Sequence, residues 1–131
     1  GDRGRISAAQ VAESINPDDV HKARTTLVCL ENSSNRGGGS CYEVREIGEI
    51  RKLCDESRLS LHLDGARLFN ALVAHGEQPA QYGRLFHSIS VCFNKGLGCP
   101  AGRPEGRGSG LRDRPRRLLG PGRRVGHPGR R

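Results

Sequence analysis

The chain has 131 residues with a formal net charge of +8, and 34% of them are hydrophobic. This length suits one domain with its own core, and there is no run of eighteen apolar residues that could form a membrane-spanning helix. The five cysteines are odd in number, widely spaced and without a Cys-x-x-Cys pair. Three of them, Cys29, Cys54 and Cys92, lie in apolar patterns, so we expect buried, reduced thiols in a cytoplasmic protein.

The positive charge is concentrated at one end of the chain. Residues 103–131 carry ten arginines against two acidic residues, whereas residues 1–102 carry twelve basic and twelve acidic residues and have no net charge. Residues 103–131 also contain seven glycines and four prolines but few apolar residues. Such a composition buries too little apolar surface to offset the entropy of the chain. We therefore predict a folded part, residues 1–102, and a disordered tail, residues 103–131.

Residues 1–102 alternate between strand and helix patterns. Short apolar runs predict strands, and apolar residues three or four apart predict helices. A capping box, Ser7 to Gln10, opens the first helix. The predicted elements are, in order, a helix to Ile15, a strand at 25–30, a helix at 42–57, a strand at 59–64, a helix at 66–75, a short helix at 79–86 and a strand at 88–93. This order predicts an α/β fold in which helical crossovers join three parallel strands.

Three polar residues close the predicted strands, namely Glu31, Asp64 and Lys95. Parallel strands bring their carboxyl ends to one edge of a sheet, where such sheets bind ligands. A lysine amine in a partly desolvated pocket can form a Schiff base with an aldehyde such as pyridoxal phosphate, and an aspartate opposite it can keep the ring nitrogen protonated. Arg67, one helical turn after Asp64, can share that face and reach the phenolic oxygen or an anion.

Two longer motifs carry a resemblance to a known family. They are residues 62–71, His-Leu-Asp-Gly-Ala-Arg-Leu-Phe-Asn-Ala, and residues 94–102, Asn-Lys-Gly-Leu-Gly-Cys-Pro-Ala-Gly. Residues 16–21 and 30–39 support them at the intervals that the family has. Over about residues 1–102 the chain resembles the low-specificity threonine aldolases, the β-eliminating lyase branch of the pyridoxal phosphate enzymes of the aspartate aminotransferase type.

The resemblance implies a fold, a cofactor and a reaction. The fold is a fragment of the large domain, a partial three-layer sandwich around a parallel sheet. The implied roles are that Lys95 forms the Schiff base with pyridoxal 5'-phosphate, Asp64 pairs with its pyridine nitrogen and Arg67 hydrogen-bonds its ring oxygen. The implied reaction cleaves a β-hydroxy amino acid such as threonine to glycine and an aldehyde. A homo-oligomer is also implied, because the resembled enzymes build their sites between subunits.

The chain departs from the family pattern at three positions. Ser34 stands where many members carry a histidine near the substrate hydroxyl, Asn94 stands where serine or threonine precedes the lysine, and His87 stands where aspartate is common. The family's N-terminal segment with its stacking histidine, and its C-terminal domain with the arginine that holds the substrate carboxylate, have no counterpart here. We therefore expect a piece of a longer protein that is inactive by itself. A non-catalytic remnant of a lyase fits the same motifs.

The tail has two interpretations. After Gly102 the family continues with an apolar strand, whereas this chain continues Arg-Pro-Glu-Gly. We hypothesise that residues 103–131 are translated out of frame, which the nucleotide sequence can test. The alternative is a nucleic-acid-binding arm whose arginines contact phosphates, although no aromatic residue lies among them for base stacking. His62 and Asp64 form half of a metal site at most, since no third ligand has suitable spacing, and we predict no metal.

Overall fold

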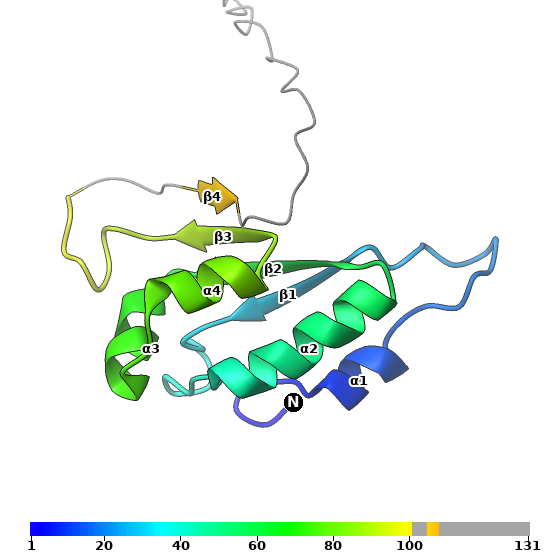
Figure 1. The fold of residues 1–131 in the computed structure, drawn as a ribbon, viewed down its shortest axis with the longest axis horizontal. Coiled ribbons are helices and arrows are strands. Elements are labelled where there is room, and N and C mark those ends of the chain that lie inside the picture. The colour runs from blue at the N-terminus through cyan, green and yellow to red at the C-terminus, as the bar shows by residue number, and fades with distance from the viewer. Residues whose placement is uncertain (101–104, 108–131) are drawn as a thin grey trace, which may run out of the picture.

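The computed structural model describes residues 1–100 and 105–107. Its elements follow the predicted order as far as the third strand, with boundaries that differ by a few residues at most. They are α1 (Ala8–Glu13), β1 (Leu27–Glu31), α2 (Val44–Glu56), β2 (Ser60–Gly65), α3 (Leu68–His75), α4 (Pro79–Leu85), β3 (Ser88–Val91) and β4 (Glu105–Arg107). Figure 1 shows the helices gathered beside one sheet. The prediction of alternating strands and helices is confirmed.

The strands form a single sheet in the order β1-β2-β3-β4. β1 pairs with β2 and β2 with β3 in parallel, so the three predicted strands are neighbours and run the same way. β4 pairs with β3 in the antiparallel sense. The sequence predicts a disordered tail that includes residues 105–107, so β4 is an element that it does not predict. The rest of the tail, on which the nucleic-acid alternative depends, lies outside the described residues.

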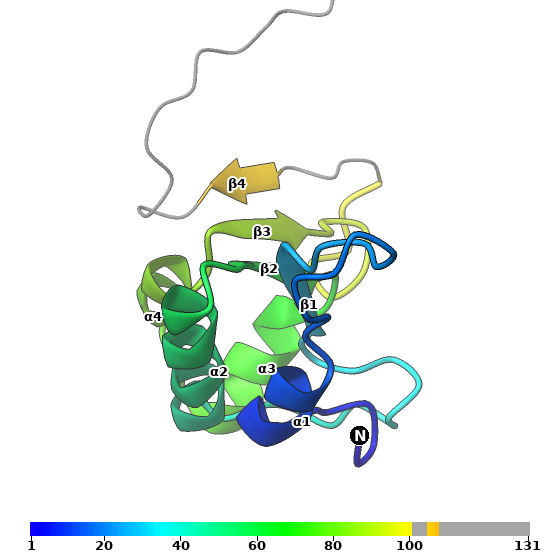
Figure 2. The ribbon, with the colours of Figure 1, turned by 90° about the vertical axis from the view of Figure 1, so that its right-hand side faces the viewer.

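The helices cover one face of the sheet, as Figures 1 and 2 show. β1 and β2 alternate between buried and more exposed residues, with Val28, Leu30, Leu61 and Leu63 buried. The apolar side of α2 meets them, and the short helix α1 adds Val11 to the same core. These described residues therefore supply two layers of the predicted three-layer sandwich, the sheet and one helix layer. Burial of alternate apolar residues is what selects this face.

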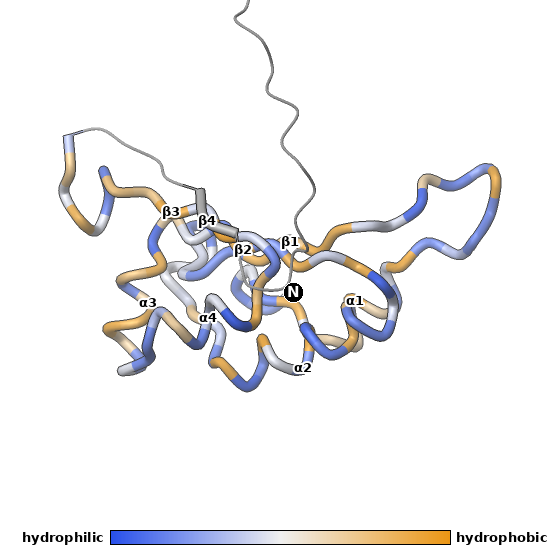
Figure 3. The backbone as a smooth tube through the Cα atoms, turned by 45° about the horizontal axis from the view of Figure 1, so that its top comes forward, coloured by the Kyte–Doolittle hydropathy of each residue, from blue (hydrophilic) through white to orange (hydrophobic). Residues whose placement is uncertain are grey.

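Local signals explain where several helices begin and end. Ser7 caps α1, since its Oγ accepts a hydrogen bond from Gln10 N, and the Gln10 side chain accepts one from Ser7 N. The capping box is thus confirmed. Gly76 ends α3 with a φ of 65°, a left-handed conformation that glycine adopts readily. The loop between α1 and β1 is largely hydrophilic and extends away from the body, with Val20 exposed in it (Figure 3).

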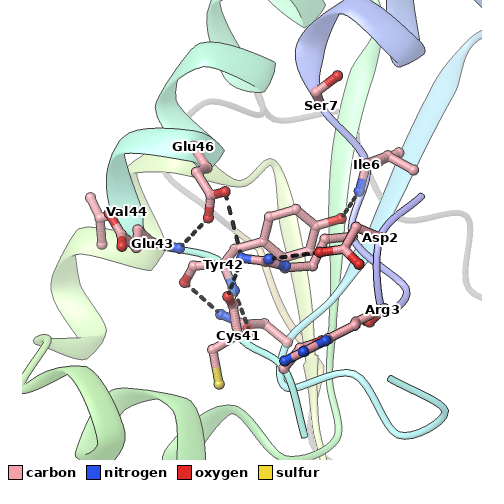
Figure 4. A network of polar contacts seen from close by, with 12 residues as sticks. Asp2, Arg3, Ile6, Ser7, Cys41, Tyr42, Glu43, Val44 and Glu46 are labelled. Carbon is pink, nitrogen blue, oxygen red and sulfur yellow. Dashed lines mark hydrogen bonds and ion pairs between the residues drawn. The ribbon is translucent and has the colours of Figure 1, made fainter. Parts of the chain in front are cut away.

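The N-terminal segment is tied to the start of α2, as Figure 4 shows. The buried side chain of Tyr42 accepts a hydrogen bond from Ile6 N at 2.8 Å. Arg5 donates from Nη1 to the carbonyl of Cys41 and lies 3.7 Å from the Glu46 carboxylate. Burial raises the pKa of the Tyr42 phenol, and the Ile6 hydrogen bond opposes that rise. The phenol is therefore a neutral structural group that fixes this segment.

The cysteines are free thiols, as expected, but their burial is not uniform. Cys54 is buried in the helix layer, where burial raises its thiol pKa, and Cys92 is half-buried. The expectation that Cys29 is buried is wrong. It lies on the side of β1 opposite Val28 and Leu30, the side that the helices do not cover. An apolar run in the sequence did not reveal that one of its faces is open.

Candidate functional site

The carboxyl ends of the three parallel strands lie in one row. The register pairs Glu31 with Asp64 and Asp64 with Ser90. Paired residues in a parallel sheet project to the same face, so these three side chains share the face opposite the helix layer. Lys95 follows β3 by four residues. The predicted meeting of strand ends at one edge of the sheet is confirmed by this register.

Asp64 and Lys95 line the same cavity, whose volume is about 120 Å³. Its other lining residues are Ala66, Ser90, Val91 and Cys92. An engineered cavity of roughly 150 Å³ holds a benzene molecule, so this space is of the right order for one small ring. An aspartate at the end of β2 and a lysine in the turn after β3 therefore line one small cavity. A heteroaromatic ring bound between an acid and an amine needs such an arrangement.

The position of Asp64 follows from its surroundings at the end of β2. Its Oδ1 accepts a hydrogen bond from Ala66 N at 3.1 Å, and its carbonyl accepts one from Asn32 N at 3.2 Å. Gly65 comes next, where an added Cβ would lie 2.8 Å from the Ser90 carbonyl oxygen. Only glycine lets the two strands approach this closely. The carboxylate is thereby held at the mouth of the cavity.

Lys95 stands in a tight turn after β3. Gly98 N donates to the Lys95 carbonyl at 3.1 Å, and Cys99 N donates to the Phe93 carbonyl at 2.9 Å, so the chain bends back on itself. An added Cβ at Gly96 would lie 2.5 Å from Asn70 Oδ1. The turn therefore rests against α3, the helix that follows Asp64. The residue after Asp64 and the residue after Lys95 both lie against α3.

Arg67 occupies a different place from the other two predicted residues. It is the N-cap of α3 and is half-buried, but it is not among the residues that line the cavity. Its side chain makes no hydrogen bond or ion pair with residues 1–100. The structure thus brings Asp64 and Lys95 together and leaves Arg67 beside them, three residues along the chain.

A buried network behind this edge was not predicted. Asn32, fully buried, donates from Nδ2 to the Tyr82 hydroxyl at 2.9 Å, and its Oδ1 accepts from Tyr42 N at 3.1 Å. Tyr82 donates in turn to Glu77 at 2.7 Å. Burial, followed by the hydrogen bond to Glu77, raises the Tyr82 pKa. A polar residue directly after a buried strand was the available signal for Asn32, but its partners come from distant segments.

The loop after β1 is closed by its own side chains. Ser34 is buried. Its Oγ donates to Glu31 at 3.4 Å and accepts a hydrogen bond from Gly37 N at 3.2 Å. In this chain the residue therefore holds the loop together. It also links the loop to the carboxylate in the same row as Asp64.

One other hollow in the described part combines acids with an amine: it is about 360 Å³ and is lined by Asp18, Asp19 and Lys22, all from the loop between α1 and β1. Another, about 540 Å³, lies between α1 and β1 and has no lysine or arginine in its lining. Residues 1–100 and 105–107 contain no cluster of three His, Cys, Asp or Glu residues that could hold a metal ion. Within those ranges no helix has the length and apolar character to span a membrane. The cavity at Asp64 and Lys95 is the candidate site because its acid and its amine lie at or just after the carboxyl ends of two neighbouring parallel strands.

Comparison with known proteins gives a consistent result. The family model for beta-eliminating lyases matches residues 1–103. The chain is 40% identical over 99 residues to the low specificity L-threonine aldolase of Escherichia coli strain K12, covering 76% of this chain and 29% of that protein. It is 43% identical over 88 residues to that of Saccharomyces cerevisiae, covering 66% and 22%. The structure of Leishmania major threonine aldolase superimposes with a TM-score of 0.63 at 26% identity, covering 70% and 27%.

The chain belongs to the beta-eliminating lyase family. The resemblance predicted from residues 62–71 and 94–102 is confirmed, and so is the α/β fold class. The chain spans less than a third of the length of each of these relatives. What the complete proteins do is therefore carried to this chain only as a proposal.

Proposed function

We propose that this chain is part of a pyridoxal phosphate-dependent lyase that cleaves β-hydroxy amino acids such as threonine to glycine and an aldehyde. The observation that carries the proposal is the cavity lined by both Asp64 and Lys95. Family membership supports it, because the relatives that match include low specificity threonine aldolases.

The proposed roles follow from the chemistry of the side chains. The Lys95 amine, when neutral, would hold the cofactor through its aldehyde carbon, with the aldehyde oxygen released as water. The Asp64 carboxylate keeps a proton on the ring nitrogen, and Arg67 donates to the ring oxygen. Pyridoxal phosphate, when bound, withdraws electrons from the bond that breaks next to the amino acid nitrogen. Asp64 determines how strongly it can do so, since an unprotonated ring nitrogen is a weaker electron acceptor.

We also propose that the isolated chain does not turn over threonine and that the complete enzyme is a homo-oligomer. The chain spans 29% of the Escherichia coli relative. Binding of the substrate carboxylate and the cofactor phosphate then depends on other parts of the family fold. Covalent attachment of the cofactor is a smaller requirement than turnover, and it can be tested on this chain alone.

The first experiment locates the cofactor on the chain. Pyridoxal phosphate is added, the bond is reduced with borohydride, and the modified peptide is identified by mass spectrometry. The chain has three lysines, Lys22, Lys52 and Lys95. We expect the modification mainly on Lys95, and we expect it to be lost in Lys95→Ala and retained in Lys52→Ala. Equal modification of all three lysines and the N-terminal amine would contradict the proposal.

The second experiment tests the reaction. Residues 1–102 replace the matching segment of the Escherichia coli relative, and glycine formation from threonine is measured. We expect cleavage in the chimera and none in the same chimera with Lys95→Ala. A chimera that binds the cofactor at Lys95 but cleaves no β-hydroxy amino acid would refute the reaction while leaving the cofactor proposal standing.

A further inference from the structure

Ser90 has a side chain whose placement needs an explanation. It is 1% exposed, and its Oγ has no hydrogen-bond partner among the described residues. It also lines the cavity shared by Asp64 and Lys95. A buried hydroxyl without a partner destabilises a protein, and such groups are few in native structures. A serine is therefore unfavourable here unless its hydroxyl has a partner.

The sheet register gives Ser90 two neighbours, Asp64 on β2 and Glu105 on β4, and Asp64 is the one that lines the same cavity. β2 and β3 pair His62 with Ser88 and, two residues on, Asp64 with Ser90. At the first pair the side chains already meet, since His62 Nδ1 and Ser88 Oγ are 2.7 Å apart. The second pair has the same register on the same face. A serine on β3 can therefore reach the side chain paired with it on β2.

One carboxylate oxygen of Asp64 is available to accept a hydrogen bond. Its Oδ1 accepts from Ala66 N, whereas Oδ2 accepts no hydrogen bond within the described residues. We propose, on the basis of the proposed function, that Ser90 is a positioning residue whose hydroxyl donates to Asp64 and keeps its carboxylate turned toward the cavity shared with Lys95. A small rotation of one or both side chains completes this hydrogen bond.

Packing alone does not explain the hydroxyl. The close approach of Gly65 to the Ser90 carbonyl involves the backbone of Ser90, and alanine would satisfy it equally. Asp64 is exposed, so its carboxylate can rotate unless a second group holds it. A neutral donor from the next strand restricts that rotation without changing the charge of the site.

The deciding experiment is a double-mutant cycle on the full chain without cofactor. Ser90→Ala, Asp64→Ala and the double variant are compared by urea unfolding. If Ser90 donates to Asp64, Ser90→Ala leaves the midpoint unchanged or lowers it in the parent chain, and raises it in the Asp64→Ala background, where the hydroxyl has lost its acceptor. If Ser90→Ala raises the midpoint equally in both backgrounds, the hydroxyl is unpaired and the proposal is wrong. Ser88→Ala is the matched control, and its effect should add to that of Asp64→Ala.

A cofactor-binding measurement tests the positioning role itself. We expect Ser90→Ala to raise the dissociation constant for pyridoxal phosphate roughly three- to tenfold. Ser90→Thr, which restores a hydroxyl, should return it toward the parent value. An unchanged constant in Ser90→Ala would overturn the positioning role. Failure of the parent chain to attach the cofactor at Lys95 would instead count against the proposed function, and the unfolding cycle would still decide whether Ser90 donates to Asp64.

Discussion

The two faces of the sheet formed by β1, β2 and β3 differ in composition, although alternate residues of the same three strands form them. The face under the helices carries Val28, Leu30, Leu61, Leu63, Ile89 and Val91. The opposite face carries Cys29, Glu31, His62, Asp64, Ser88 and Ser90. Apolar burial on the first face stabilises the fold, while the polar side chains of the second face include Asp64 and Ser90, which line the cavity. A strand can thus serve both purposes because its side chains alternate.

The largest effect on stability is expected from the covered face. Leu61→Ala deletes a fully buried side chain at the centre of β2 and should lower the free energy of unfolding by about 2–4 kcal/mol. Leu27→Ala is the matched control, since Leu27 is 50% exposed on the opposite face, and it should cost under about 1 kcal/mol. Urea unfolding measures both. Equal losses would show that the two faces do not differ as described.

Asn32 is a polar residue whose role is structural, which sharpens the contrast. Asn32→Ala leaves the buried Tyr42 amide without a partner and removes the donor to the Tyr82 hydroxyl, which keeps its bond to Glu77, and should cost about 2–3 kcal/mol. Asn35→Ala, at an exposed position in the same loop, should cost under about 0.5 kcal/mol. Thermal or urea unfolding distinguishes the two. A small loss for Asn32→Ala would mean that the network is replaced by water.

Gly65 connects the two faces, because it lies next to Asp64 and against the β3 backbone. Gly65→Ala places a Cβ 2.8 Å from the Ser90 carbonyl oxygen and 3.1 Å from Leu68 Cβ. We expect a loss of about 1–3 kcal/mol and weaker cofactor attachment at Lys95, since the strands must separate. Gly48→Ala, where an added Cβ meets nothing within 4 Å, should instead stabilise α2 by about 0.5–1 kcal/mol. A Gly65→Ala chain as stable as the parent would contradict the close approach.

A smaller effect is expected on lowering the pH. Burial and the nearby Arg51 lower the pKa of His87 from its ordinary value of 6.5, and His87 Nδ1 accepts a hydrogen bond from Leu61 N. The folded state thus binds protons less readily at His87 than the unfolded state. Its contribution to stability is fully present above pH 6.5 and is lost as the pH falls below it. Unfolding midpoints between pH 7.5 and 5 should fall less in His87→Gln than in the parent, and parallel curves would refute this.

The smallest effect concerns residues 103–131. We propose that residues 103–131 are translated out of frame, so they should not be required for cofactor attachment at Lys95. Reading the gene one base later after the codon for Gly102 should restore an apolar, family-like strand. A shifted frame without such a strand would show that the segment is genuine coding sequence.

Much of the fold was predictable because its signals are local. The alternation in residues 59–63 and the helical spacing in residues 42–57 depend on neighbours within a few positions, and both elements formed as expected. The meeting of Asp64 and Lys95 followed from one general rule, that parallel strands end at a common edge. Arg67 is the N-cap of α3 and does not line the cavity, so its bond to the ring oxygen stays a prediction.

The sequence by itself determined the order of the elements and the two residues that share the cavity, because periodicity and parallel pairing follow from short-range geometry. The tertiary structure alone decided that Cys29 is exposed, that Ser90 is buried beside Asp64, and that Asn32 binds Tyr82. Each of these depends on which distant segment covers or contacts the residue. Contacts across 26 to 50 residues leave no periodic signal in the chain.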